Sequence, residues 1–238
     1  MPPGVEAGDT AEVKAVIDGD TLTLADGRVV RLVGIAAPKP PLGATAGSAP
    51  LAERAAAALA ELVLAREVTL AYGGRRSDRY GRLLAQLYRD DGLWLQGEML
   101  AHGLARVVTH PDNRALAHQM LERERAAREA RLGIWAAPSF AVLRPEEASR
   151  HLDGFELIEG RVERVTESGT RSFLHFGSDT RRGFTAVVTP EGRRLLAAAG
   201  MAPASLAGQR LRVRGFVRWW SGPVIDVTHP EQIELIGP

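Results

Sequence analysis

Apolar and polar residues alternate over residues 11–35, as they do in β-strands that bury one face. The alternating segments are 12–17, 21–24 and 29–33. Asp18-Gly19-Asp20 and Ala25-Asp26-Gly27 separate these segments, and glycine supplies the positive φ that tight hairpin turns need. The pattern predicts a three-stranded meander at the start of the chain.

The rest of the first half mixes helical and strand patterns. A loop rich in proline and glycine follows over 38–50 and cannot pair in a sheet. Predicted helices cover 51–65, 93–102 and 114–131. Predicted strands at 68–72 and 83–88 flank a basic loop over 73–82.

From Phe155 the strand pattern starts again. Strands are predicted over 157–165, 173–176, 184–188, 210–219 and 224–227, with a short helix over 191–199. Three strands, a helix and two strands is the element order of the OB-fold, and the first half has the same order before its helical tail. The prediction is a mainly β fold: a barrel with three helices over 10–137, a linker over 138–152 and a second small OB-like barrel over 153–236.

Composition narrows the class of protein. The chain is 45% hydrophobic and 25% charged, which excludes disordered, collagen-like and coiled-coil classes. Its formal net charge is +1, so any anion site must be local. The absence of cysteine excludes disulfides, thiolate nucleophiles and cysteine-based zinc sites.

The sequence indicates a soluble protein, because no apolar run reaches the length that spans a bilayer. The first residues lack the basic and apolar regions of a signal peptide. We therefore expect either a cytoplasmic protein or an exported one whose leader has been removed, and we expect a monomer.

Two sets of residues could carry chemistry. In Asp18-Gly19-Asp20-Thr21, two carboxylates across a turn can present oxygens to calcium, although the same segment is ordinary hairpin chemistry. Arg31 and Arg82, from separate strands, can fork onto one phosphate and neutralise charge that grows in phosphoryl transfer, unless both are simply solvated.

Five motifs in order connect these residues. They are Val16-Ile17-Asp18-Gly19-Asp20-Thr21, Arg31-Leu32-Val33-Gly34-Ile35-Ala36-Ala37-Pro38, Ser77-Asp78-Arg79-Tyr80-Gly81-Arg82, Gly103-Leu104-Ala105-Arg106-Val107 and Leu132-Gly133-Ile134-Trp135. Over residues 10–137 the chain resembles the staphylococcal nuclease (thermonuclease) family. The resemblance implies an OB barrel with helices and a calcium-dependent phosphodiesterase that acts on DNA and RNA. It places the acidic calcium ligand on Asp20 and the phosphate-binding arginines on Arg31 and Arg82.

The chain departs from that family at the active site. Where the family's type member has Asp-Thr-Pro-Glu, with a second calcium ligand and a proposed general base, this chain has Ala36-Ala37-Pro38-Lys39. Ala37 keeps only its backbone carbonyl as a ligand, and Lys39 places a cation that repels calcium. A positioned base is worth about 10²- to 10⁴-fold in rate, so its loss predicts a large defect. The base-stacking tyrosine expected near Val108-Thr109-His110-Pro111 is also missing.

Other polar residues have more ordinary interpretations. Asp18 and Asp78 are predicted to serve the turn and the loop backbone, with substitution for the missing ligand as the alternative. His110 and His118 lack metal-ligand spacing and are predicted at the surface.

In the second half, aromatic residues lie beside arginines. This combination is typical of a platform that stacks the bases of single-stranded nucleic acid. The candidate residues are Trp219, Trp220, Arg214 and Arg218, together with Arg212, Phe173, His175 and Phe176. The alternative is that one tryptophan of the pair points into the core, because adjacent residues of a strand face opposite sides.

The sequence thus predicts a metal-dependent phosphodiesterase of endonuclease type, acting on single-stranded DNA or RNA through an altered and weakened site, with Ca²⁺ as its expected cofactor. The alternative is a non-catalytic nucleic-acid or ligand-binding protein that kept the nuclease fold. A third class, a structural or interaction module built from two small barrels, stays open.

Overall fold

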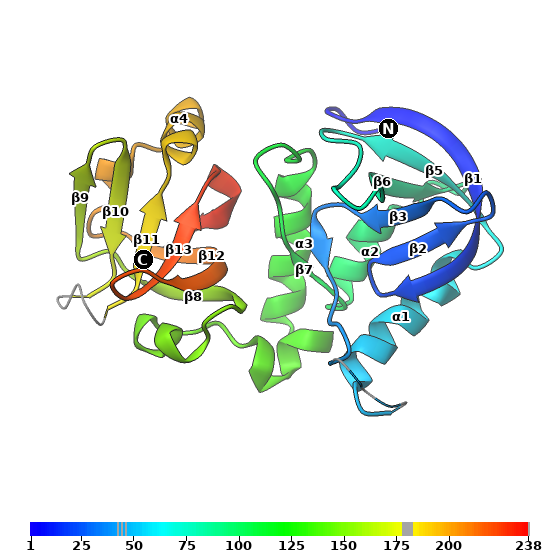
Figure 1. Cartoon of the computed structure of the whole chain (residues 1–238), viewed down its shortest axis with the longest axis horizontal. Helices are drawn as coiled ribbons and strands as arrows, with labels where there is room; N and C mark the ends of the chain where they lie inside the picture. The colour runs from blue at the N-terminus through cyan, green and yellow to red at the C-terminus, as the bar shows by residue number, and fades with distance from the viewer. Residues whose placement is uncertain (42, 44, 46, 178–182, 238) are drawn as a thin grey trace. The chain divides into compact units, whose positions relative to one another are not determined.

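The computed structural model describes residues 1–41, 43, 45, 47–177 and 183–237. The predicted loop over 38–50 includes residues 42, 44 and 46, which lie outside the described residues. The chain divides into two compact units, Met1–Pro138 and Ser139–Pro238 (Figure 1). Leu143 and Ala148, from the segment predicted as a linker, belong to the core of the second unit. The predicted domain limits stay a prediction.

Within the described residues, the first unit is built on a closed barrel with the strand order β1-β2-β3-β6-β5. Its strands are β1 (Glu6–Asp18), β2 (Thr21–Leu24), β3 (Val29–Leu32), β5 (Glu67–Tyr72) and β6 (Leu83–Arg89). β3 and β6 are parallel, and the other neighbours are antiparallel. The barrel predicted for the N-terminal half is therefore confirmed, with β1 beginning six residues earlier, at Glu6 instead of Glu12.

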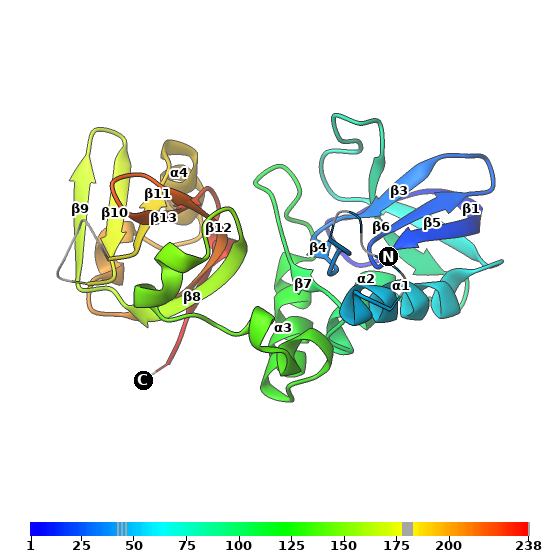
Figure 2. The same ribbon diagram turned by 60° about the horizontal axis from the view of Figure 1, so that its bottom comes forward.

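The first two helices of this unit pack against barrel strands, and the third packs against the second helix (Figures 1 and 2). They are α1 (Pro50–Val63), α2 (Leu95–Ala101) and α3 (Ala117–Glu129). α1 has proline in its first turn and buries Ala52, Ala55, Leu59 and Val63, which recur every three or four residues along one face. A pair of two-residue strands, β4 (Ile35–Ala36) and β7 (Arg106–Val107), was not predicted.

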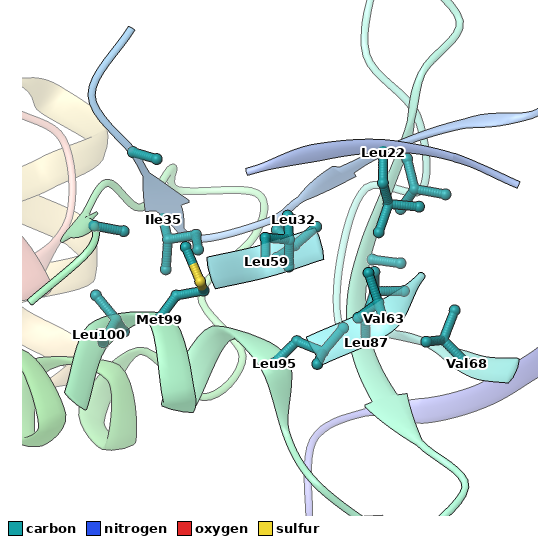
Figure 3. Packing of buried hydrophobic residues seen from close by; sticks show 14 of the residues in the cluster. Leu22, Leu32, Ile35, Leu59, Val63, Val68, Leu87, Leu95, Met99 and Leu100 are labelled. Carbon is teal, nitrogen blue, oxygen red and sulfur yellow. The ribbon is translucent and has the colours of Figure 1, made fainter. Parts of the chain in front are cut away.

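The core of the first unit forms where strand and helix side chains converge, as Figure 3 shows. The labelled side chains are Leu22, Leu32, Ile35, Leu59, Val63, Val68, Leu87, Leu95, Met99 and Leu100. All ten are 0–1% exposed. This core fixes the ends of β1, β3 and β4, which carry the residues of the predicted site.

The second unit contains a sheet that, over the described residues, has seven strands. They are β8 (Phe155–Arg161), β9 (Arg164–Ser168), β10 (Arg171–His175), β11 (Thr185–Val188), β12 (Arg210–Trp219), β13 (Pro223–Val227) and β14 (Ile233–Leu235). The helix α4 (Pro190–Ala198) joins β11 to β12. Thr189 is its N-cap, and the Thr189 hydroxyl accepts a hydrogen bond from the Gly192 N–H. The chain also contains short 3₁₀ helices. They are η1 (Gly133–Ala136) in the first unit, η2 (Pro138–Phe140) at the boundary, and η3 (Pro145–Arg150), η4 (Pro203–Leu206) and η5 (Pro230–Gln232) in the second unit.

This second sheet is not closed, so the prediction of a second closed barrel is wrong. The predicted strand 157–165 is broken into β8 and β9 at Val162 and Glu163. The Val162 N–H bonds the Gln209 carbonyl, whereas the Glu163 N–H bonds the His175 carbonyl. The chain therefore changes partners at this point, β8 pairing with β12 and β9 with β10.

Candidate functional site

Asp20 lies in the turn between β1 and β2, and it is fully buried. Its carboxylate accepts hydrogen bonds from the Ala37 N–H at 2.7 Å and from the Thr21 hydroxyl at 3.0 Å. The Asp20 N–H in turn donates to Asp18 Oδ1 at 3.0 Å. The turn therefore holds a buried carboxylate in one orientation, and Asp18 serves the turn as predicted.

Glycine is needed at position 19 because there is no room for a side chain. A Cβ at Gly19 would lie 2.6 Å from the Ala55 Cβ of α1 and 2.7 Å from the Ala37 Cβ. Gly27, in the next turn, has the positive φ of +88° that the sequence predicts, but Gly19 is not among the glycines with positive φ. Close approach of α1 and the segment after β4 explains glycine at this position.

Two cations meet the Asp20 carboxylate. Arg31 forms an ion pair with Asp20 Oδ1, and its Nη2 donates to the Ile35 carbonyl at 3.1 Å. Lys39 Nζ lies 2.5 Å from Asp20 Oδ1 and 2.6 Å from Asp18 Oδ1. The lysine predicted to repel a metal ion instead bridges the two carboxylates.

Sheet register explains why Arg31 reaches this place. Arg31 pairs across β2–β3 with Thr21, the residue after Asp20. Burial lowers the pKa of the Arg31 guanidinium; the Asp18 carboxylate opposes this and the Arg82 guanidinium adds to it. Arg31 is therefore a desolvated cation held between an acidic turn and a second arginine.

Arg82 ends the basic loop and lies at the start of β6, which runs parallel to β3. Asp78 fixes it, because Asp78 Oδ1 accepts the N–H groups of Tyr80 and Arg82 and Asp78 Oδ2 accepts Arg82 Nε at 2.7 Å. Asp78 thus has the predicted role in the loop. The Arg82 guanidinium lies 5.7 Å from the ring of Tyr80, an exposed aromatic residue that the sequence analysis did not single out.

The Lys39 ammonium group lies close enough to Arg31 and Arg82 to feel the charge of both. Burial lowers the pKa of its ammonium group, the Asp18 carboxylate opposes this, and the charges of Arg31 and Arg82 lower the pKa further. Three cationic groups from β3, the loop after β4 and the start of β6 therefore share one neighbourhood. We call Arg31, Lys39 and Arg82 the cationic cluster.

The residues present do not fit a calcium site. Calcium takes six to eight oxygen ligands, and this site offers only the Asp18 and Asp20 carboxylates and the Ala37 carbonyl as its predicted donors. Ala36 supplies a methyl group, and Lys39 already bonds both carboxylates. Among the described residues there is also no group of three or more His, Cys, Asp or Glu side chains that could hold a metal ion.

The remaining predicted residues lie elsewhere. His110 and His118 are exposed, as predicted, and His118 faces Glu122 at 3.5 Å. In the second unit, Trp219 and Trp220 are 58% and 45% exposed. Arg218 is held by Asp226 through two hydrogen bonds of 2.6 Å.

Arg214 and Phe176, which were predicted to belong to the stacking platform of the second unit, are buried instead. Arg214 is 1% exposed and forms an ion pair with Glu234 of β14, so its guanidinium does not reach the surface. Arg212 is held in the same network, by Glu159 and Glu234. Phe176 is 5% exposed and packs in the core against Phe184. Sequence alternation alone cannot reveal that an arginine of β12 is buried and paired with a glutamate 20 residues away in the sequence.

The first unit therefore combines a closed five-stranded barrel with a buried acidic turn and with two arginines, Arg31 and Arg82, that interact electrostatically. Residues 29–137 match the family model described as staphylococcal nuclease homologue. The chain is 32% identical over 127 residues to an uncharacterized endonuclease of Escherichia coli, covering 52% of this chain and 75% of that protein. It is 30% identical over 131 residues to the thermonuclease of Staphylococcus intermedius, covering 54% and 77%. The chain therefore belongs to the staphylococcal nuclease family, and the match ends at residue 137.

Proposed function

We propose that the N-terminal unit binds the phosphodiester backbone of single-stranded DNA or RNA through the cationic cluster, without calcium. Family membership suggests a phosphodiesterase nuclease, and two of the curated relatives are named endonuclease and thermonuclease. In this chain the same fold presents arginines for phosphate but has exchanged two acidic positions for Ala36 and Lys39. Binding of the substrate class is thereby kept, and hydrolysis is weakened.

The observation that carries this proposal is the unequal exposure of the two kinds of charge. Asp20 is fully buried, whereas the side chain of its partner Lys39 is 44% exposed. Asp78 is 17% exposed, whereas its partner Arg82 is 36% exposed. In both ion pairs the cation is the more exposed partner, so a phosphate that approaches Lys39 or Arg82 meets a hydrogen-bond donor first.

The chemistry of these side chains favours binding over cleavage. Guanidinium groups present forked N–H donors that match two oxygens of one phosphate. Hydrolysis also needs a group that removes a proton from water, and Lys39, as an ammonium group paired with two carboxylates, holds a proton instead of accepting one. Lys39 can donate a hydrogen bond to a phosphate oxygen, but it cannot replace the base.

The second candidate is the metal-dependent phosphodiesterase, with Asp20 and the Ala37 carbonyl as ligands of calcium or another divalent ion. It is favoured by the retention of Asp20, Arg31 and Arg82 together, and by the names of the relatives. It requires Lys39 to leave Asp20. Cleavage assays with calcium, magnesium and manganese separate the two candidates, because only the second depends on added metal.

The test of the proposal is binding of the full chain to a labelled abasic deoxyribose-phosphate oligomer in EDTA, measured by anisotropy over a range of salt. Affinity is expected to fall with a log–log slope of about −0.7 per phosphate neutralised. Replacing Arg31 and Arg82 with alanine should flatten the slope by about one to two units. The matched control replaces Arg54 and Arg125, exposed arginines of α1 and α3, and should leave the slope unchanged. An unchanged slope in the Arg31/Arg82 variant, or binding that requires calcium, contradicts the proposal.

A further inference from the structure

The sheet of the second unit has two different faces. Leu174, Ala186, Val188, Val217, Ile225 and Val227 point to one face and form the core of this unit. Strand alternation places Phe173 and His175 of β10 on the opposite face. The antiparallel register puts Phe173 beside Thr166 of β9 and Val187 of β11. We call this opposite side the outer face.

Three aromatic rings form a row on the outer face. Phe173 and His175 are stacked, with ring centroids 6.3 Å apart and planes 11° apart. Phe173 also lies 5.9 Å from Trp220, with the planes tilted by 43°. Trp220 comes from the turn between β12 and β13. The row therefore brings together residues that are distant in the sequence, since Trp220 follows His175 by 45 residues.

Arginines border this row. The guanidinium groups of Arg171 and Arg218 lie 5.9 Å and 5.4 Å from the Trp220 ring centroid. Arg218 is neutralised by Asp226. Arg171 is exposed, and no ion pair joins it or Arg164 to a carboxylate of the described residues. The outer face therefore combines flat apolar rings with available positive charge.

The row is held in position before any ligand arrives. His175 bonds the hydroxyl of Thr166 at 2.8 Å through Nε2 and the hydroxyl of Thr185 at 3.3 Å through Nδ1. Burial lowers the pKa of His175, and the Arg164 charge lowers it further, so the ring is neutral at physiological pH. The backbone N–H of Trp220 donates a hydrogen bond to the Gly222 carbonyl, which holds the turn that carries the ring. Fixed rings lose little freedom on binding, which favours affinity.

We propose that the outer-face row of His175, Phe173 and Trp220, with Arg171, is a second binding site, which takes the bases of single-stranded nucleic acid by stacking. Aromatic side chains accept any base because every base has a π-face, and the adjacent arginine answers the phosphate charge. The second and third strands of OB-type folds, with the turns after their first and fourth strands, are where oligonucleotides bind. When β8 and β9 are counted as one strand, β10 is the second strand of this unit, and the β9–β10 and β12–β13 turns follow its first and fourth strands. The site lies outside the family match and does not rest on the function proposed for the cationic cluster.

The experiment measures binding of the full chain to two labelled oligomers of equal length, an oligothymidylate and the abasic oligomer. Replacing Phe173 and Trp220 with alanine should weaken oligothymidylate binding by about 5- to 150-fold per lost stacked base and leave abasic binding almost unchanged. The Arg31/Arg82 variant should weaken both. These patterns separate failure at the second site from failure of the phosphate site.

Trp219 provides the matched control. It is more exposed than Trp220, but alternation points it to the other side of β12, and Trp219→Ala should leave oligothymidylate binding unchanged. Circular dichroism and thermal melting show that each variant is folded. If the Phe173/Trp220 variant misfolds, tryptophan fluorescence replaces it as the test. Oligothymidylate should then quench the fluorescence of Trp219→Ala, and this quenching should be lost in Trp220→Phe. Equal affinity of parent and Phe173/Trp220 variant for oligothymidylate, or equal loss in Trp219→Ala, overturns the proposal.

Discussion

Lys39 Nζ lies 2.5 Å from Asp20 Oδ1, at the carboxylate that the family resemblance assigns to a metal ion. The same ammonium group lies 2.6 Å from Asp18. One side chain of the protein therefore supplies positive charge to both acids of the turn. Positions 36 and 39, where the family resemblance leads us to expect acidic residues, hold alanine and lysine, and the lysine occupies the Asp20 oxygen that a metal ion would need.

The first prediction reverses that change. The double variant Ala36→Asp, Lys39→Glu adds a second anionic ligand, removes the bridging cation and restores a candidate base. Calcium-dependent cleavage of single-stranded DNA is expected to rise by at least about 10²-fold, the contribution of one positioned base. Cleavage of a labelled oligonucleotide with calcium and with EDTA measures it.

The single variants are the controls for this prediction. Ala36→Asp keeps the lysine, and Lys39→Glu lacks the second ligand, so each should gain much less than the double variant. Calcium should also raise the melting temperature of the double variant, because a ligand that binds only the folded state stabilises it. A folded double variant that cleaves no faster than the parent with calcium, magnesium or manganese would show that the scaffold no longer places Asp20, Arg31 and Arg82 for hydrolysis.

The second prediction concerns the stability of the acidic turn. Asp20→Asn removes the buried charge that Arg31 and Lys39 share, and the free energy of unfolding should fall by about 3 kcal/mol, the low end for a broken buried ion pair, because both cations keep access to water. Urea denaturation measures it. The control is Asp26→Asn, whose ion pair with Arg28 is exposed to solvent and should contribute much less to stability. Equal losses of unfolding free energy in the two variants would mean that the burial of Asp20 adds nothing to the strength of its ion pairs.

The third prediction tests the close approach at Gly19. Gly19→Ala should destabilise the protein by about 1–3 kcal/mol, because the new methyl group overlaps the Ala55 and Ala37 side chains. Combining it with Ala55→Gly removes one of the two overlaps, so the double variant should lose less than the sum of the single losses. A double-mutant cycle by denaturation measures the coupling, and strict additivity would contradict the packing explanation.

The fourth prediction uses the lowered pKa of His175. Because the unfolded chain binds the proton at a higher pH than the folded one, stability should be constant above the usual histidine pKa of 6.5 and fall as the pH decreases from there toward the folded-state pKa. Thermal melting of the parent and of His175→Gln between pH 8 and pH 5 measures it. The variant should lose part of the pH dependence; identical profiles would place the acid sensitivity in other groups.

Much of the fold follows from local pattern. Alternation predicts the strand 210–219 with the bounds that β12 has, and it predicts the helices and most other strands to within a few residues, but it misses the first six residues of β1. It misses the two-residue pair β4 and β7 and the short strand β14, because segments of two or three residues carry no periodicity. It also joins β8 and β9, because a change of pairing partner at Val162 leaves no mark in the alternation.

The sequence by itself determined the family, the acidic turn and the two arginines, since these depend on residue types in a fixed order along the chain. Only the tertiary structure decided what each charged group meets. Lys39 reads as a repelling cation in the sequence, yet it lies against Asp20 because the segment after β4 returns to the β1–β2 turn. Arg214 was predicted as a surface contact, yet it is buried and forms an ion pair with Glu234 of β14. Electrostatic partners depend on distances across the fold, and the order of residues does not contain those distances.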